Sequence, residues 1–217
     1  MCWNQYVSIN TFVFGIFVLL FIGFNNTYSN YKIEFFKNPY AYVFMFSVVL
    51  IQFVEFILWR NLNNYIINRM FSVFGLLLVC IQPVTSLLLI TDIRLRNRML
   101  MLYTIPAIVF LLYNVLTVDI HTTTSHSGYL FWKWTFKMTV LFKALVTFFY
   151  LFFLFFPLIY NKYYVTLFFL FVYFLIIYYF GKDGSSGSIW CLFANSLFLY
   201  FLFHILVAMP YCEITGC

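Results

Sequence analysis

Charged side chains are scarce in this sequence. They make up 8% of its 217 residues, whereas an ordinary soluble domain carries about 25%. Hydrophobic residues account for 65% and are spread over the whole length instead of gathering in one anchor. A water-soluble fold cannot bury so large an apolar fraction, so we predict a polytopic membrane protein whose first partner is the lipid bilayer.

Runs of basic residues are also missing. The formal net charge of +6 is scattered through the polar connections, and no stretch of Lys and Arg is long enough to follow a phosphate backbone. We therefore expect no nucleic-acid partner. The first apolar segment has no basic stretch before it and no small-residue cleavage site after it, which predicts a retained helix and not a signal peptide.

Hydrophobic runs separated by polar breaks predict seven membrane helices, each close to the roughly 20 residues that cross a bilayer. We expect an all-α fold, a single seven-helix transmembrane domain over residues 1–217. The break at Asn161 and Lys162 is the weakest, and we keep it because the joined run would be too long for one crossing. The predicted helices are residues 6–24, 39–59, 67–91, 98–118, 137–160, 163–180 and 188–209.

An odd number of helices places the two termini on opposite faces of the membrane. Arg94, Arg96 and Arg98 crowd into one short connection, which favours the cytoplasm for the face opposite the N-terminus. We therefore predict an extracytoplasmic N-terminus and a cytoplasmic C-terminus. A glycosylation sequon at residues 25–27 (NNT) argues for the reverse, but short sequons occur often by chance.

One ionisable residue, Glu55, interrupts the apolar segment between residues 39 and 60. At helical spacing Gln52, Glu55 and Trp59 share one face. A carboxylate facing lipid would cost about 2.5 kcal/mol or more, so we expect Glu55 to face other helices. Intramembrane carboxylates usually line paths for ions, protons or ligands, which makes Glu55 the centre of a predicted polar pocket.

Lys143 and Asn195 are candidate neighbours of Glu55. The second predicted helix ends and the fifth begins on the N-terminal face, so Glu55 and Lys143 should both lie roughly 7–9 Å inside that boundary. They could form a buried ion pair. Alternatively, the Lys143 ammonium reaches the interface, and Glu55 is protonated or bonded to Gln52 or Asn195. The sequence leaves both alternatives open.

Polar and small residues at helical spacing mark the interior faces of two other helices. Such side chains let helices approach and hydrogen-bond to one another, and most of them serve packing. We add two of these residues, Ser72 and Gln82, to the predicted pocket. The stripes are Asn4, Ser8, Thr11 and Gly15 in the first helix, and Asn68, Ser72, Gly75, Val79, Gln82 and Ser86 in the third.

The chain has five cysteines. Cys2 and Cys191 are expected on the same membrane face, where a disulfide would join the N-terminus to the last helix. Cys80 lies within the third helix and is expected to serve packing. Cys212 and Cys217 lie near the predicted cytoplasmic end, where they are candidates for palmitoylation or remain free thiols.

Histidines offer a weaker possibility, a zinc site. His121 and His126 lie in a connection rich in Thr and Ser, but they lack the i, i+4 spacing of a helical metal site and have only Asp119 as a nearby carboxylate. Zinc held by these histidines with Cys2 and Cys191 is supported only by their shared membrane face. We therefore expect no metal and no cofactor.

Short motifs along most of the chain resemble an uncharacterised family of multi-pass membrane proteins from fungi, protists and giant viruses whose members begin Met-Cys-Trp. The resemblance implies no established activity. It does imply that the Cys-Trp pairs and the Glu55 face belong to one site. The motifs are Met1-Cys2-Trp3, Gln52 with Glu55 and Trp59, Gln82-Pro83, Gly128-Tyr129-Leu130-Phe131-Trp132, and Trp190-Cys191.

Two better-known seven-helix families fit poorly. Microbial rhodopsins need a Schiff-base lysine in the middle of the last helix, and residues 188–209 contain none. Membrane hydrolases related to alkaline ceramidases use several histidines with Ser and Asp. This chain has three histidines, and His204 is expected far from His121 and His126.

Three functions remain. We favour a receptor-like or transport bundle whose pocket around Glu55 takes a proton, an ion or a small ligand. The first alternative is a structural protein of a viral inner membrane or envelope, in which polar stripes serve only assembly. The second is a zinc-dependent membrane hydrolase, so an enzyme is not the favoured class. A homo-oligomer is compatible with each of them.

Overall fold

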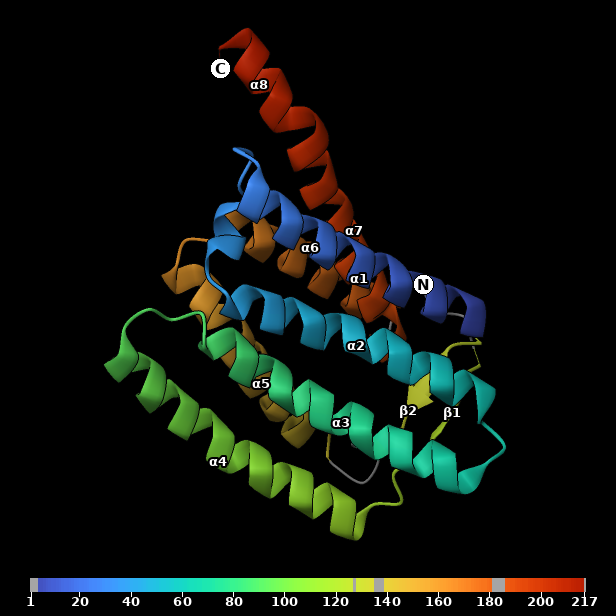
Figure 1. Ribbon diagram of the computed structural model, residues 1–217. Helices are drawn as coiled ribbons and strands as arrows, with labels where there is room; N and C mark the ends of the chain where they lie inside the picture. Colours follow the sequence, from blue (N-terminus) through green and yellow to red (C-terminus); the bar gives the residue numbers. More distant parts are fainter. Residues whose placement is uncertain (1–3, 127, 135–138, 181–185, 217) are drawn as a thin grey trace.

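The computed structural model describes residues 4–126, 128–134, 139–180 and 186–216, and they form an almost entirely helical bundle (Figure 1). The prediction of an all-α fold is confirmed in outline. The helices are α1 (Gln5–Tyr28), the 3-10 turn η1 (Glu34–Lys37), α2 (Tyr40–Arg60), α3 (Tyr65–Leu87), α4 (Ile93–Thr117), α5 (Val140–Tyr160), α6 (Tyr164–Phe180), α7 (Ser186–Phe203), the π turn η2 (His204–Ala208) and α8 (Met209–Thr215).

Six of these helical segments, within the described residues, are long and apolar enough to cross a membrane. They make the chain a multi-pass membrane protein by length and composition. α6 has 17 residues, the lower limit for a crossing, so the predicted count of seven spans is not fully confirmed. The six are Gln5–Tyr28, Tyr40–Arg60, Tyr65–Leu87, Ile93–Thr117, Leu141–Tyr160 and Asn195–Thr215.

Polar side chains at the membrane edges start four of the helices. In each case a side-chain oxygen accepts a hydrogen bond from a backbone N–H of the first turn, which has no partner within the helix. The capping residues are Asn4 before α1, Asn64 before α3, Asp92 before α4 and Thr139 before α5. These residues therefore set where the chain enters each of these four helices.

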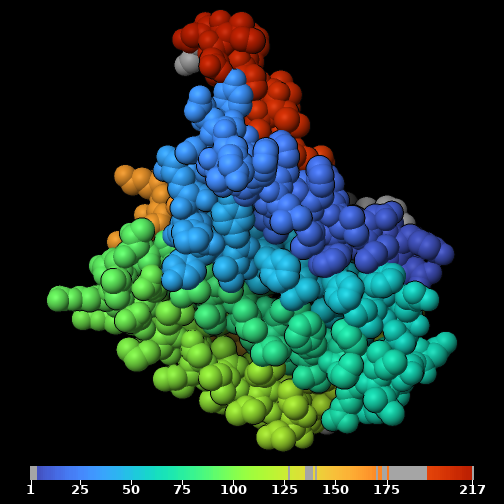
Figure 2. Space-filling model, viewed as in Figure 1, coloured from blue at the N-terminus to red at the C-terminus, as the bar shows by residue number. Residues whose placement is uncertain are grey.

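The last helix extends further than predicted. α7 continues through η2 into α8, and this rod projects beyond the rest of the bundle, as Figures 1 and 2 show. The apolar segment accordingly runs to Thr215, not to residue 209. Pro210 stands in the first turn of α8, directly after the π turn. Because Pro lacks an N–H, a π turn at this point lets the helix continue past it.

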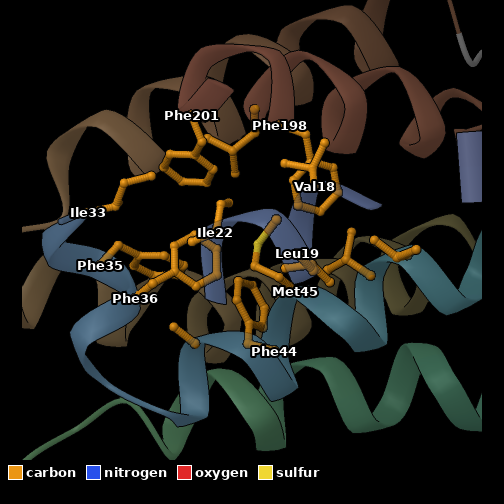
Figure 3. Close-up of a cluster of buried hydrophobic side chains, with 14 of the residues drawn as sticks. Val18, Leu19, Ile22, Ile33, Phe35, Phe36, Phe44, Met45, Phe198 and Phe201 are labelled. Carbon is orange, nitrogen blue, oxygen red and sulfur yellow. The ribbon is translucent and has the colours of Figure 1, made fainter. Parts of the chain in front are cut away.

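α2 is the central helix of the bundle. It packs against α1, α3 and α7, and more of it is buried than of any other candidate span. At one end an apolar core joins these elements: Val18 and Ile22 of α1, Phe44 of α2 and Phe198 of α7 are fully or almost fully buried there (Figure 3). The opposite end, which holds the N-terminus, contains most of the polar side chains.

A small β-hairpin occupies part of the connection between α4 and α5. β1 (Thr122–Thr124) pairs antiparallel with β2 (Leu130–Trp132), and Thr122 lies opposite Trp132. The sequence pattern predicted only a loop in this region. Strands of three residues are too short to show the alternation of polar and apolar residues that predicts a strand.

Gly15 allows α1, α2 and α7 to approach closely. A Cβ atom there would lie 2.9 Å from Val49 Cγ2 and 3.2 Å from Phe198 Cε2. We predict that Gly15→Ala lowers the free energy of unfolding by about 1–3 kcal/mol, because Val49 is stiff and cannot turn away. Unfolding in mixed micelles, followed by circular dichroism, measures the effect.

Gly23→Ala is the matched control, since a Cβ there meets only a Tyr42 ring atom at 3.8 Å. It should change the free energy of unfolding by less than about 1 kcal/mol. Equal effects of the two substitutions would contradict the close approach at Gly15.

Candidate functional site

Gln52 and Glu55 of α2 are both completely buried. α1 touches α2 at Phe53, whose ring centroid lies 5.1 Å from that of Phe12. α3 touches another side of α2 at Ser47. Helical geometry places Gln52 and Glu55 between these two contacts, on the side that faces the bundle interior and α7. This is where a carboxylate in an apolar helix is expected.

The crossing at Gly15 defines a common level for three helices. From Val49 to Gln52 and from Phe198 to Asn195 the chain advances three residues toward the N-terminal face, a rise of about 4.5 Å in each helix. The amides of Gln52 and Asn195 therefore lie at the same depth. Both belong to neighbouring helices, since α2 contacts α7.

A second polar level lies closer to the N-terminal face. Glu55 is six residues beyond Val49 and Ser8 is seven residues before Gly15, so both stand about 9–10 Å from the crossing. Ser8 is also completely buried. Its hydroxyl donates to the Asn4 carbonyl of its own helix. Neutral polar groups thus accompany Glu55 on both levels.

α3 provides a polar wall on the other side of the interior. The Gln82 side chain is 1% exposed, and its Oε1 accepts a hydrogen bond of 2.7 Å from the Tyr150 hydroxyl of α5. This bond fixes the orientation of the amide. One turn further on, the Ser86 hydroxyl donates to the Leu154 carbonyl at 2.8 Å. Gln82 and Ser86 of the predicted α3 stripe therefore face α5.

The hairpin is fastened to α3 by side-chain hydrogen bonds. Asn68 Nδ2 donates to the Thr122 carbonyl at 2.8 Å, and the Thr122 N–H donates to Asn68 Oδ1 at 2.8 Å. The hydroxyls of Ser72 and Thr122 lie 2.7 Å apart, and the Trp134 indole N–H donates to the Ser72 carbonyl at 3.2 Å. Ser72 is thus a docking residue of the hairpin.

The other strand of the hairpin enters between α2 and α3. Leu130 and Trp132 pack with the buried residues Val54 and Leu58 of α2. The Trp132 ring lies so close to Gly75 that a Cβ atom there would come within 2.5 Å of it. β2 also contacts α7. The hairpin therefore covers the polar interior on the N-terminal face.

Several buried polar atoms around this interior have no hydrogen-bond partner among the described residues. A buried polar group without a partner costs about 1–3 kcal/mol, so native proteins bring water or a ligand to such groups. Two of the atoms belong to one amide, that of Gln52. The atoms are Gln52 Oε1 and Nε2, Gln82 Nε2, Trp132 Nε1 and Asn195 Oδ1. We call this set of buried polar side chains, together with Glu55, the polar chamber.

Lys143 is partly exposed near the start of α5, a helix that packs against α3. This position is compatible with the alternative in which its ammonium reaches the interface. The buried ion pair with Glu55 stays the other predicted alternative.

The histidine region holds a polar cluster. His121 Nδ1 lies 3.3 Å from Asp119 Oδ2, and Lys133 Nζ lies 3.0 Å from His121 Nε2. The Lys133 ammonium thus occupies the nitrogen that would bind a metal, and His126 is exposed in the turn. Within the described residues no three His, Cys, Asp or Glu side chains come together around a possible metal ion.

The cysteine predictions have mixed outcomes. Cys212 is disulfide-bonded, so its prediction as a palmitoylated or free thiol is wrong. Cys80 is a free, partly buried thiol within α3. The predicted disulfide involves Cys2 and the side chain of Cys191, which lie outside the described residues.

A separate depression lies at the surface, at the connection between α2 and α3. It has a volume of about 690 Å³ and is open to solvent. Trp59 borders it, whereas Gln52 and Glu55 do not. Its lining is residues 59–66. Trp59 therefore marks the boundary between the buried polar interior and the membrane surface.

Three residues of the site have no clear signal in the sequence. Tyr150 lies in a helix rich in aromatic residues, and nothing in its spacing distinguishes it. Thr122 and Trp132 lie in a connection with no recognisable strand pattern. The nearest available signal was the glycine at position 75 in a polar stripe, which indicates that something packs closely there.

The fold and the site define a multi-pass helical membrane protein with a polar interior. No family model, no curated protein and no solved structure matches the chain. Its resemblance to the family that begins Met-Cys-Trp therefore stays a prediction, and function must be argued from the chamber itself.

The bond between Tyr150 and Gln82 yields a test of the chamber wall. Tyr150→Phe leaves Gln82 Oε1 buried without its donor, so we predict a loss of about 1–2 kcal/mol in the free energy of unfolding. Tyr150→Phe combined with Gln82→Leu removes both partners and should be less destabilising than Tyr150→Phe alone. Additive losses in this double-mutant cycle would show that the two side chains do not interact.

Proposed function

We propose that this protein is a receptor-like or transport protein that binds a proton, an ion or a small polar ligand in the polar chamber. The Gln52 amide carries the proposal. It is completely buried, and neither of its polar atoms has a partner among the described residues. An amide in this state is suited to bind a group that donates and accepts hydrogen bonds.

The purely structural alternative explains other polar residues better than it explains Gln52. Ser47 pairs with Thr85, and the Ser86 hydroxyl pairs with a carbonyl of α5, so these groups join helices directly. Gln52 joins no described residue in this way. Retaining an unbonded amide beside a carboxylate would only weaken a scaffold, which favours a binding role.

The surroundings of Glu55 favour a proton or a cation over an anion. Among the described residues, helical geometry brings the neutral side chains of Ser8, Gln52 and Asn195 to the same two levels. A carboxylate attracts positive charge, and in a medium of low dielectric constant this attraction is strong. Carboxylates inside membranes serve such paths in many transporters.

Glu55→Gln tests the proposal because it removes the charge and keeps the shape. In liposomes that contain the purified protein, we expect proton or cation flux to fall at least about tenfold, a change of about 1.4 kcal/mol in the barrier. A pH-sensitive dye inside the vesicles measures proton flux, and potential-sensitive dyes measure cation flux.

Glu34→Gln is the matched control, since Glu34 is exposed and pairs with Lys37 on the surface. It should leave the flux unchanged. Equal flux in wild type and Glu55→Gln, with a change only in stability, would support the structural alternative, a protein of a viral inner membrane or envelope.

The orientation in the membrane is a second proposal, an extracytoplasmic N-terminus. Arg94 and Arg98 are exposed at the start of α4, and arginines near a short connection hold it in the cytoplasm during insertion. The sequon opposes this orientation only weakly. Asn25 is 6% exposed, and its Nδ2 donates to the Tyr31 carbonyl, so a glycan on this nitrogen would not fit the folded protein.

The disulfide at Cys212 does oppose it, because disulfides form mainly outside the cytoplasm. We give the arginines more weight, since they act while the chain is being inserted. A membrane-impermeant amine reagent applied to intact cells should modify Lys133, on the N-terminal face, and leave Lys32 and Lys162 unmodified. Modification of Lys32 and Lys162 alone would reverse the orientation.

A further inference from the structure

We propose that the β1–β2 hairpin is a plug that closes the polar chamber on the N-terminal face and moves aside to admit the ligand. The purpose of the plug rests on the proposed function. Its movement is a separate property and can be measured without any ligand.

The position of the hairpin supports this role. Thr122 and Leu130 are at most 1% exposed, so the hairpin is inserted into the bundle and does not lie on its surface. Counting along α3 from Gln82 to Gly75, the Trp132 ring lies about 10 Å closer to the N-terminal face than Gln82. Trp132 therefore stands between the chamber and that face.

The way the hairpin is held suggests that it can leave without disrupting the helices. Two strands of three residues have little stability of their own, because an isolated hairpin is marginal at best. Its attachment depends on side chains, chiefly the two bonds between Asn68 and the Thr122 backbone. The helices α2 and α3 also pack on each other directly.

At the outer end of the hairpin, a chain of polar contacts connects it to α3. Lys133, the residue after Trp132, contacts His121, which contacts Asp119. The Tyr65 hydroxyl of α3 donates to Asp119 at 2.7 Å. These contacts can exchange with water at little cost, unlike the buried bonds of Asn68. The two hydrogen bonds between Asn68 and the Thr122 backbone should therefore control the movement of the hairpin.

Thiol labelling at position 52 tests the plug. Gln52→Cys places a reporter in the chamber, and a membrane-impermeant maleimide labels it only when the chamber is open. Peptide mass spectrometry measures labelling at this position separately from the native cysteines. We expect Asn68→Leu to raise the labelling rate about tenfold or more, since it removes both bonds to Thr122.

Asn26→Leu is a matched control. Asn26 makes the same pair of bonds to the Ile33 backbone, but it lies at the C-terminal end of α1, away from the hairpin. It should leave labelling at position 52 unchanged. A similar rise in labelling for Asn68→Leu and Asn26→Leu would indicate general loosening of the bundle and would overturn the proposal that the hairpin is a plug.

Gly75→Ala provides an independent route to the same result. Its added methyl group would meet the Trp132 ring at 2.5 Å and displace it, so labelling should rise even if Asn68→Leu does not fold. Unchanged labelling in both Asn68→Leu and Gly75→Ala would overturn the proposal. Raised labelling in a protein whose flux is insensitive to Glu55→Gln would leave the plug standing and reject the proposed function.

Discussion

The cost of burying polar side chains in an apolar bundle determines the organisation of this protein. Inside a membrane each such group needs a partner from the protein, from water or from a ligand. Most interior polar groups of α3 meet this requirement with a neighbouring element: Asn68 and Ser72 bind the hairpin, and Gln82 binds Tyr150. Neither polar atom of the Gln52 amide has a partner among the described residues, and the proposed function follows from that.

The hairpin provides hydrogen-bond partners for buried polar groups and also covers the bundle on its N-terminal face. Its polar strand satisfies the outer residues of the α3 stripe, and its apolar strand covers the interior with Leu130 and Trp132. One short element therefore completes the packing of the bundle and separates the chamber from the N-terminal face. A glycine at position 75 makes this possible, because any side chain there would collide with the Trp132 ring.

The opposite end of the molecule is built differently. There Val18, Ile22, Phe44 and Phe198 form a continuous apolar core, and polar groups lie mainly in the connection after α1. The Tyr31 hydroxyl in that connection donates to the Glu213 carboxylate of α8, which raises the pKa of the tyrosine. A ligand entering the chamber from this end would have to cross the apolar core, so the hairpin face is the more accessible route.

The sequence by itself determined the class of protein, most helix positions and the burial of the α3 stripe, because hydrophobic length and helical period are local properties of the chain. It also identified Glu55 as the residue to explain. Only the tertiary structure decided which side chains meet. Thr122 and Trp132, for example, reach α3 from a connection without any helical pattern. Such contacts depend on how helices rotate and where a loop folds back, and neither is encoded in the spacing of residues along one segment.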